Sequence, residues 1–359
     1  MKIHHIINSY ETDAGGAEKL VRNIHKYLIK NKIKSSIFGL MHNDINVSNC
    51  ENTGLNSPYN YKAFLSLKRY CDKNVHESDI IHSHLFPANF FCSIIKILKL
   101  TKATLITTEH STHNRRRNKI WGKLLDLIIY TPCRSIISIS LGVKNELINW
   151  IPSIKTKVLV IENGCFLYHK IPIARKKKIS PVQLVSIGAL KDAKNYQVVI
   201  DSMNEIRNLD FVWSIAGDGY LKNSLLSQVN KLGLNEKIIF LGHTNNVWPL
   251  LEKSDIFIMG SKWEGFGLAA VEAMNSSLPI IVSDVPGLKE VAKHKLICAL
   301  FIDPINKLDI AEKTRRMILD YDLRLEFGLN SFKNSKKFDE SRMFKSYINL
   351  YNKLVNTLN

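Results

Sequence analysis

Short runs of apolar, largely β-branched residues alternate along this chain with longer segments whose apolar residues recur at helical spacing. This alternation predicts parallel strands, because parallel neighbours need a crossover connection and a helix usually supplies it. A sheet built in this way is covered by helices on both faces. In the first half of the chain the expected strands are KIHHII, SSIFGL, DIIHSH, TLITTEH, SIISIS and VLVIEN.

The same alternation starts again after a basic, proline-flanked stretch, YHKIPIARKKKISP, which is typical of a linker. The strands expected beyond it are VQLVSIG, FVWSIAG, KIIFLG, DIFIMG and LPIIVS. We therefore predict an α/β protein with two Rossmann-like, doubly wound parallel-sheet domains, residues 1–168 and 181–339, joined by a linker at 169–180. The length of 359 residues and the hydrophobic content of 45% suit two buried cores. Ligands of such sheets bind beyond the carboxyl ends of the strands, so the loops there are expected to carry the function.

The loop after DIFIMG places two acidic residues around a glycine-rich turn, in EGFGLAAVE. Gly265 and Gly267 remove side chains that would keep an anion away from the backbone. The first amides of the following helix have no intrahelical partners and attract phosphate. Glu264 before the turn and Glu272 inside the helix add a carboxylate at each end. A ligand with a central diphosphate and hydroxyl-rich groups on both sides fits this pattern, and a nucleotide sugar is such a ligand.

The motif EGFGLAAVE resembles the E-x7-E signature of the retaining glycosyltransferase family 4, which has the GT-B fold. Residues 214–291 are similar to the donor domain of that family, and GGAEKLVRNIH, IIHSHLF, TEHS and IENG follow the order of its acceptor domain. The resemblance implies an acceptor-side domain first, a nucleotide-sugar-binding domain second and a cleft between them. It also implies that the last helix, expected at 340–359, crosses back onto the first domain.

The resemblance assigns roles to residues of the glycine-rich turn. It implies that Glu272 binds the ribose hydroxyls and that Glu264 contacts the donor sugar or its reacting face. The backbone amides of Phe266, Gly267 and Leu268 would hold the sugar hydroxyls and the diphosphate. The alternative for the two acids is a solvated loop carboxylate and a helix surface charge.

Further candidates follow other strands. Gly15 and Gly16 lie between the first strand and a helix, where the backbone can approach a diphosphate. His110 ends a strand at the point where the family places a histidine beside the donor sugar. Lys194 matches the family's lysine, the cation at the leaving diphosphate.

The segment SIGALKDAKN departs from the family pattern, which has an arginine where this chain has Ala189. A lysine cannot replace the bidentate fork of an arginine. Stabilisation of the leaving group therefore has to come from Lys194, the helix amides or a neighbour such as Lys191. Altered donor geometry, weaker activity and lost activity all remain open.

Two sequence patterns imitate metal sites. His82 and His84 have the spacing of a ligand pair but no third ligand is indicated, so we expect them at the end of the sheet, facing the cleft. The D-x-D of Asp320–Asp322 lies in a helical, salt-bridging pattern. We therefore predict no metal and no cofactor, with a nucleoside-diphosphate sugar, most simply a UDP-sugar, as co-substrate.

The formal net charge of +18 indicates an acidic partner, and the excess is denser in the first half. Nucleic acid is not expected, because no helix-turn-helix, zinc-finger or RNP pattern accompanies the charge. Residues 113–130 combine basic and apolar side chains and suit an anionic membrane surface, although an amphipathic helix with a basic solvent face would look the same. The residues concerned are Arg115, Arg116, Arg117, Lys119 and Lys123 beside Trp121, Leu124, Leu125, Leu127, Ile128 and Ile129.

Scattered cysteines and the lack of a long apolar run indicate a cytoplasmic protein, peripheral at most to the inner face of the cell membrane. The resemblance implies a glycosyltransferase that moves a sugar from a nucleoside-diphosphate donor to a glycan or lipid-linked acceptor, with retention, in bacterial-type surface polysaccharide synthesis. A sugar-nucleotide epimerase on the same fold is one alternative. A non-catalytic homologue that binds nucleotide sugars is another, and Ala189 is its best support. The donor sugar, its base and the acceptor are not determined by the sequence.

Overall fold

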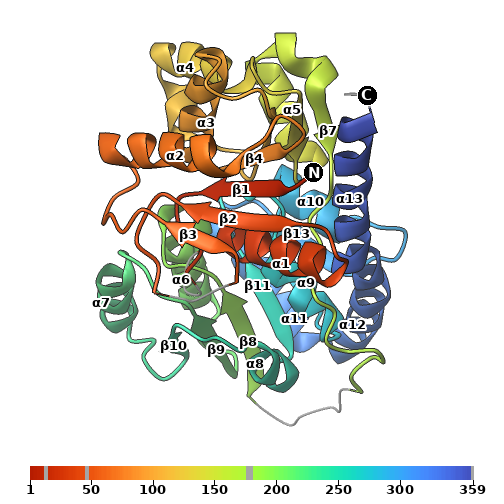
Figure 1. Cartoon of the computed structure of the whole chain (residues 1–359). Coiled ribbons are helices and arrows are strands. Elements are labelled where there is room, and N and C mark those ends of the chain that lie inside the picture. Colours follow the sequence, from red (N-terminus) through yellow and green to blue (C-terminus); the bar gives the residue numbers. More distant parts are fainter. Residues whose placement is uncertain (12–14, 45–47, 175–180, 357–359) are drawn as a thin grey trace. The chain divides into compact units, whose positions relative to one another are not determined.

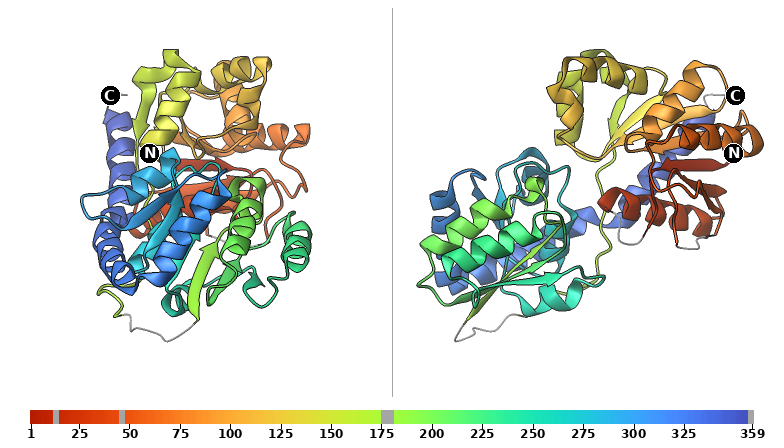
Figure 2. Two further views of the ribbon diagram at one scale, coloured as in Figure 1. Left: turned by 180° about the vertical axis from the view of Figure 1, so that it is seen from behind. Right: turned by 90° about the vertical axis from the view of Figure 1, so that its left-hand side faces the viewer.

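The computed structural model describes residues 1–11, 15–44, 48–174 and 181–356, which form two compact units (Figure 1). Unit 1 consists of Met1–Glu162 and Ser341–Asn359, and unit 2 of Asn163–Glu340. Each unit is built on one parallel sheet with helices on both of its faces (Figures 1 and 2). This confirms the predicted fold class, two doubly wound α/β domains.

Unit 1 has a seven-stranded sheet in the order β3-β2-β1-β4-β5-β6-β7. The order reverses at β1, which pairs with both β2 and β4, so a topological switch point lies between β1 and β4. The strands are β1 Ile3–Ile7, β2 Ser35–Gly39, β3 Cys50–Asn52, β4 Ile80–His84, β5 Thr104–Glu109, β6 Ser135–Ser138 and β7 Val158–Val160. The helices are α1 Gly16–Lys30, α2 Tyr61–Asn74, α3 Ala88–Ile97, η1 Arg115–Asn118, α4 Ile120–Tyr130, α5 Leu141–Trp150, η2 Pro152–Lys157 and α13 Glu340–Asn356.

Successive residues of each central strand of unit 1 face opposite cores, because side chains alternate across a sheet. Ile6 and Ile81 belong to the core under α2, α3, α4 and α5. Ile3 and Ile80 belong to the other core, which α1 and α13 cover. The tail helix α13 contributes five buried side chains to this second core, namely Met343, Phe344, Tyr347, Tyr351 and Leu354.

Unit 2 has a six-stranded sheet in the order β10-β9-β8-β11-β12-β13, with its switch point between β8 and β11. The strands are β8 Val182–Ile187, β9 Phe211–Ala216, β10 Ile238–Gly242, β11 Ile256–Met259, β12 Ile280–Ser283 and β13 Ala299–Ile302. The helices are η3 Asp192–Lys194, α6 Tyr196–Glu205, α7 Lys222–Leu232, α8 Trp248–Lys253, α9 Leu268–Asn275, α10 Pro286–Ala292, α11 Lys307–Leu319, α12 Tyr321–Ser335 and η4 Lys336–Phe338.

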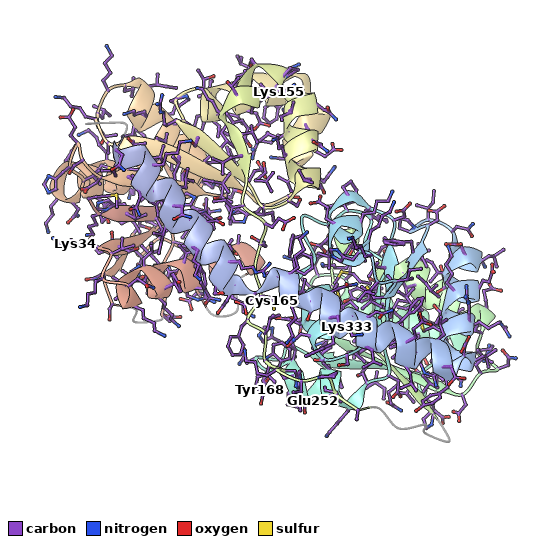
Figure 3. The ribbon with its side chains drawn as sticks, turned by 90° about the vertical axis from the view of Figure 1, so that its right-hand side faces the viewer. Lys34, Lys155, Cys165, Tyr168, Glu252 and Lys333 are labelled. Carbon is purple, nitrogen blue, oxygen red and sulfur yellow. The ribbon has the colours of Figure 1, made fainter. Side chains whose placement is uncertain are left out.

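Tyr168 and His169, on either side of the predicted start of the linker, both pack onto unit 2. Tyr168 stacks on Trp248 of α8 with ring centroids 5.1 Å apart, and His169 lies 3.5 Å from the carboxylate of Glu252. Figure 3 shows Tyr168 beside Glu252. The backbone amide of His169 also donates to the side chain of Asn275 at 2.9 Å. These contacts explain why residues 163–174 belong to unit 2, whereas residues 175–180 of the predicted linker lie outside the described residues.

The D-x-D of Asp320–Asp322 lies at a helix start. The side chain of Asp320 caps α12 by accepting from the amide of Leu323 at 2.9 Å, and Asp322 lies in the first turn. An acid at this end of a helix has a structural role. Within the part of the chain that the structure describes, no helix combines the length and the apolar character needed to cross a bilayer.

Candidate active site

The loops that follow β8 and β11 flank the switch point of unit 2, and they carry Lys194 and Glu264. The loop after β8 is fixed by Asn195, which has a left-handed backbone with φ of 57°. Its buried side-chain amide donates to the carbonyl of Gly260 at 3.0 Å and to that of Pro304 at 2.6 Å. Asn195 therefore ties the β8 loop to the end of β11 and holds Lys194 above the switch point.

The geometry of the turn before α9 depends on two glycines, Gly267 in the turn itself and Gly287 in the neighbouring helix α10. Gly267 has φ of 100°, a conformation that side chains disfavour, and a Cβ there would lie 2.6 Å from the side chain of Leu288. A Cβ on Gly287 of α10 would lie 2.4 Å from the carbonyl oxygen of Glu264. Close packing of α10 on the turn thus sets the start of α9 at Leu268. Gly267 has no side chain to cap that helix, so its first amides can serve a ligand.

Lys194 and Glu264 form an ion pair, with 21% and 18% of their side chains exposed. Because both groups are partly shielded from water, their attraction is stronger than that of a surface pair. The hydroxyl of Tyr196 donates to the carbonyl of Gly188 at 3.2 Å, and burial together with nearby Glu264 raises the pKa of this phenol. The site therefore holds a cation and a carboxylate beside the helix start.

Glu272 lies within α9 and is 9% exposed. It is therefore no solvated surface charge, the alternative that its sequence position left open. A carboxylate is rarely buried to this extent unless it has polar partners or a ligand to bind. Phe266, beside the turn, is buried and packs edge-to-face on Phe338 at 5.5 Å. The roles of Glu264, Glu272, Lys194 and the turn amides in binding a donor stay predictions.

Gly15 and Gly16 lie at the start of α1, after β1 and hence at the switch point of unit 1. Gly15 has no capping side chain, and a Cβ there would lie 3.1 Å from the carboxylate of Glu18. Residues 12–14, just before this turn, are outside the described residues. The role of Gly15 and Gly16 in approaching a diphosphate therefore stays a prediction.

His82 and His84 do not face a cleft, and that expectation is wrong. Both side chains are fully buried, because the parity of β4 turns them toward the same core as Ile80, and His82 lies under α13. His82 contacts the hydroxyl of Tyr351 at 2.8 Å and that of Thr108 at 2.7 Å. Burial lowers the pKa of His82 to about 3, so its ring is neutral.

His5, which no sequence motif indicates, is the partner of this pair. His5 faces His82 across the β1–β4 register, and its Nδ1 lies 3.2 Å from Nε2 of His84. Nitrogens of His5, His82 and His84 lie within 4.8 Å of one another, which is close enough to consider a metal ion. However, both nitrogens of His82 already have hydroxyl partners, and both nitrogens of His84 contact other histidines. A metal ion would have to break these contacts, so the arrangement does not fit one.

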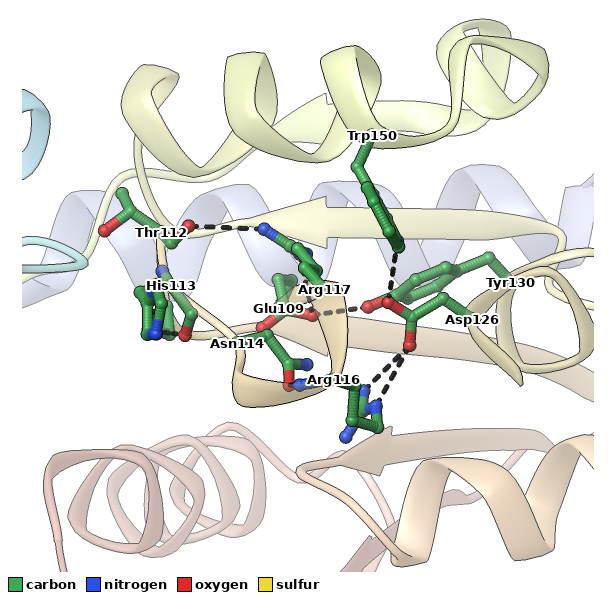
Figure 4. Close-up of polar contacts among 10 residues, drawn as sticks. Glu109, Thr112, His113, Asn114, Arg116, Arg117, Asp126, Tyr130 and Trp150 are labelled. Atoms are coloured by element: carbon green, nitrogen blue, oxygen red, sulfur yellow. Dashed lines mark hydrogen bonds and ion pairs between the residues drawn. The ribbon is translucent and has the colours of Figure 1, made fainter. Parts of the chain in front are cut away.

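The arginines of residues 113–130 are only partly available to a membrane (Figure 4). Arg116 pairs with buried Asp126 at 2.9 Å, and Asp126 also accepts from the indole of Trp150 at 3.0 Å. Arg117 lies 3.8 Å from Glu109, which accepts the hydroxyl of Tyr130. Arg116 and Arg117 are therefore structural, which corrects their predicted place in a membrane-facing basic patch, and the side chain of Arg115 lies outside the described set.

The rest of the segment is divided between core and surface. Trp121 and Leu124 of α4 are 56% and 64% exposed, and Lys123 between them is exposed as well. Ile129 is fully buried. The exposed set of Lys119, Trp121, Lys123 and Leu124 is called the α4 patch below.

Residues 170–334 match the family described as glycosyl transferases group 1, and residues 14–166 match glycosyltransferase family 4. The chain is 25% identical over 372 residues to the O-antigen biosynthesis glycosyltransferase WclY of Escherichia coli, with 99% of each chain covered. It is also 25% identical, with 99% of each covered, to a Campylobacter jejuni α-1,4-N-acetyl-D-galactosaminyltransferase named for its PP-undecaprenol-linked saccharide.

Solved structures with low identity share the fold. Sucrose-phosphate synthase from Thermosynechococcus elongatus superposes with a TM-score of 0.85 at 17% identity, over 99% of this chain and 100% of the other. The Anabaena protein HepE, crystallised with UDP-glucose, superposes with a TM-score of 0.79 at 16% identity, over 98% and 100%.

Two parallel-sheet α/β units with loops of this kind at their switch points define the GT-B class of glycosyltransferases. The chain belongs to the group 1, family 4 type of these enzymes. It is thus a glycosyltransferase, and the comparisons give no support to the alternative of an epimerase.

Proposed function

We propose that this enzyme transfers a sugar from a UDP-sugar to a lipid-linked or glycan acceptor during the synthesis of a bacterial surface polysaccharide. The observation that carries the proposal is the pairing of Lys194 with Glu264 at the switch point of unit 2, beside the open start of α9. A cation, free amides and two carboxylates match the parts of a nucleotide sugar. The WclY relative acts in O-antigen synthesis, the Campylobacter relative is named for an undecaprenol-linked saccharide, and HepE was crystallised with UDP-glucose.

In this proposal the ion pair exchanges partners when the donor binds. Lys194 turns to the diphosphate and Glu264 to the sugar, while the amides that begin α9 hold phosphate and sugar oxygens. Glu272 accepts hydrogen bonds from the ribose hydroxyls. With Ala189 in place of an arginine, Lys194 is the principal side-chain cation of this site.

The bond between the anomeric carbon and the phosphate oxygen breaks, and UDP leaves with the electron pair. The acceptor hydroxyl oxygen attacks the same carbon, and its proton passes to the departing phosphate. Attack on the face from which UDP leaves gives retention. Positive protein groups stabilise the developing charge, so no metal and no cofactor is required in this scheme.

We also propose that the protein is cytoplasmic and rests on the inner face of the membrane through the α4 patch. Exposed Trp121 and Leu124, with Lys119 and Lys123 beside them, suit the headgroup layer of an anionic leaflet. An undecaprenol-linked acceptor would be presented at that surface.

A screen of nucleotide sugars tests the activity. Each donor is incubated with the enzyme and with undecaprenol-diphosphate-linked saccharides, and products are read by mass spectrometry. We expect one sugar to be added and the nucleoside diphosphate to be released, with loss of both in Lys194→Ala. Donor binding by calorimetry without turnover on any acceptor would contradict transfer and favour the non-catalytic homologue.

A further inference from the structure

Three histidines of unit 1 form a hydrogen-bonded chain that the proposed mechanism does not use. Nδ1 of His5 lies 3.2 Å from Nε2 of His84, and Nδ1 of His84 lies 3.3 Å from Nε2 of His110. His5 and His84 are fully buried, on β1 and at the end of β4. His110 follows β5 and is partly exposed. This hydrogen-bonded chain of histidines therefore runs from the interior of the sheet to its carboxyl end.

The outer nitrogen of His110 is open. Its Nδ1 has no hydrogen-bond partner among the described residues. Because His110 is partly exposed and directly follows β5, it lies at the carboxyl end of the sheet, where ligands of such folds bind.

The contacts force the three rings to share one tautomer. A neutral imidazole carries one N–H and one bare nitrogen. If His84 carries its proton on Nδ1, it donates to His110, whose proton must then be on Nδ1 as well. Nε2 of His84 is then bare, so His5 must donate from its own Nδ1. The reverse arrangement places all three protons on Nε2.

The buried end of the chain selects between these arrangements. Nε2 of His5 is buried and has no hydrogen-bond partner. With the protons on Nε2, this atom would be a buried N–H without an acceptor, and orphaned buried donors are rarer than under-satisfied acceptors. The arrangement with all protons on Nδ1 avoids that. Burial lowers the pKa of His110 to about 4 and holds the pKa values of His5 and His84 well below the usual histidine range, so all three rings are neutral.

We propose that His5 and His84 are positioning residues that fix His110 with its proton on Nδ1, so that His110 donates a hydrogen bond to a substrate oxygen and accepts no proton during the reaction. That the oxygen belongs to a nucleotide sugar rests on the proposed function. The tautomer of His110 is independent of the proposed function, because it follows from the contacts among the three histidines.

The first experiment reads the tautomers directly in the full-length, ligand-free protein. Nitrogen-15 labelling of histidine distinguishes a protonated ring nitrogen from a bare one by NMR. We expect protonated Nδ1 and bare Nε2 in His5, His84 and His110. Protons on Nε2 in these rings, or a mixture of tautomers in His110, would overturn the proposal without any reference to catalysis.

The second experiment replaces His84, the middle residue of the three hydrogen-bonded histidines. In His84→Leu we expect His110 to populate both tautomers and the affinity for the UDP-sugar found in the screen to fall about two- to fivefold, in proportion to the fraction of His110 that leaves the donating tautomer. His84→Gln, whose amide both donates and accepts, should restore part of that affinity. Unchanged tautomer or unchanged affinity in folded His84→Leu would refute the positioning role. If His84→Leu does not fold, His5→Leu is read in the same way.

His4 supplies the matched control. It is buried on the same strand but on the opposite face, where it contacts Tyr70 and Asp79. His4→Leu should lower the melting temperature and leave the tautomer of His110 and the donor affinity unchanged. Zn²⁺ added to the wild type should not raise the melting temperature. A rise that disappears in His84→Leu would identify a metal site and overturn the hydrogen-bonded chain.

Discussion

Lys194 and Glu264, 70 residues apart in the sequence, neutralise each other across the switch point of the second sheet. The two groups that the family resemblance assigns to opposite parts of the donor are thus partners in the ligand-free enzyme. Donor binding has to exchange this pair for contacts with diphosphate and sugar. Lys194 and Glu264 therefore have partners in both the ligand-free and the donor-bound enzyme. A substitution of either residue is expected to affect both of these states.

Lys194→Ala is expected to reduce turnover by about 100- to 1,000-fold, the cost of losing one main electrostatic contact to the transition state. Ala189→Arg should keep or raise activity, because it adds the missing bidentate cation. Lys231→Ala, at an exposed position in the last turn of α7, is the control and should change little. Steady-state kinetics measures all three. A nearly silent Lys194→Ala would place the phosphate site elsewhere.

Glu272→Ala is expected to weaken donor binding by about 1 to 3 kcal/mol, because it removes charged acceptors for the ribose hydroxyls. Calorimetry with the donor measures this, and unchanged affinity would contradict the assigned role. Circular dichroism should show an intact fold, which excludes a general loss of structure.

Glu264→Gln is expected to lower turnover more than donor affinity, because its carboxylate acts at the reacting sugar. It also leaves Lys194 without its ion-pair partner, which favours binding of the diphosphate. The test compares kcat with the calorimetric affinity for the donor. Equal losses in both would indicate a simple binding role.

The fold was predictable because alternating strand and helix patterns depend on local sequence. The start of α9 was predictable because the glycine-rich turn directly precedes it. The histidine chain was not predictable in the same way. His5 and His84 are 79 positions apart and meet only because β1 and β4 are neighbours in the sheet. Likewise, the sequence places Arg116 in a basic run, but its partner Asp126 is recognisable only once η1 and α4 have folded together.

Unit 1 is expected to lose stability as the pH falls from about 6.5, the pKa of a histidine in the unfolded chain, toward 5. Burial lowers the pKa of His110 to about 4 and that of His82 to about 3, so the unfolded state binds protons that the folded state does not. Stability therefore rises with pH in this window and levels off above it.

Hydrogen exchange at several pH values measures this effect strand by strand. Amides of β1 and β4 should become less protected at pH 5 than at pH 7.5. The strands of unit 2 contain no histidine and provide the internal control. Equal loss of protection in β4 and β11 would argue against the buried histidines as the cause.

The α4 patch is expected to bind anionic vesicles and to release them at high salt. Each lysine near an anionic surface contributes about 1 kcal/mol, so Lys119→Ser with Lys123→Ser should weaken binding by roughly 30-fold. Trp121→Ser with Leu124→Ser should weaken vesicle binding too, without lowering the melting temperature, because both side chains are more than half exposed.

Arg116→Ser is the contrasting variant, because Arg116 lies in the same segment but is not part of the α4 patch. It leaves buried Asp126 without its cation, so it should lower the melting temperature. Sedimentation with phosphatidylglycerol and phosphatidylcholine vesicles measures binding, and equal sedimentation with both would reject the membrane surface as a partner and favour a soluble acceptor.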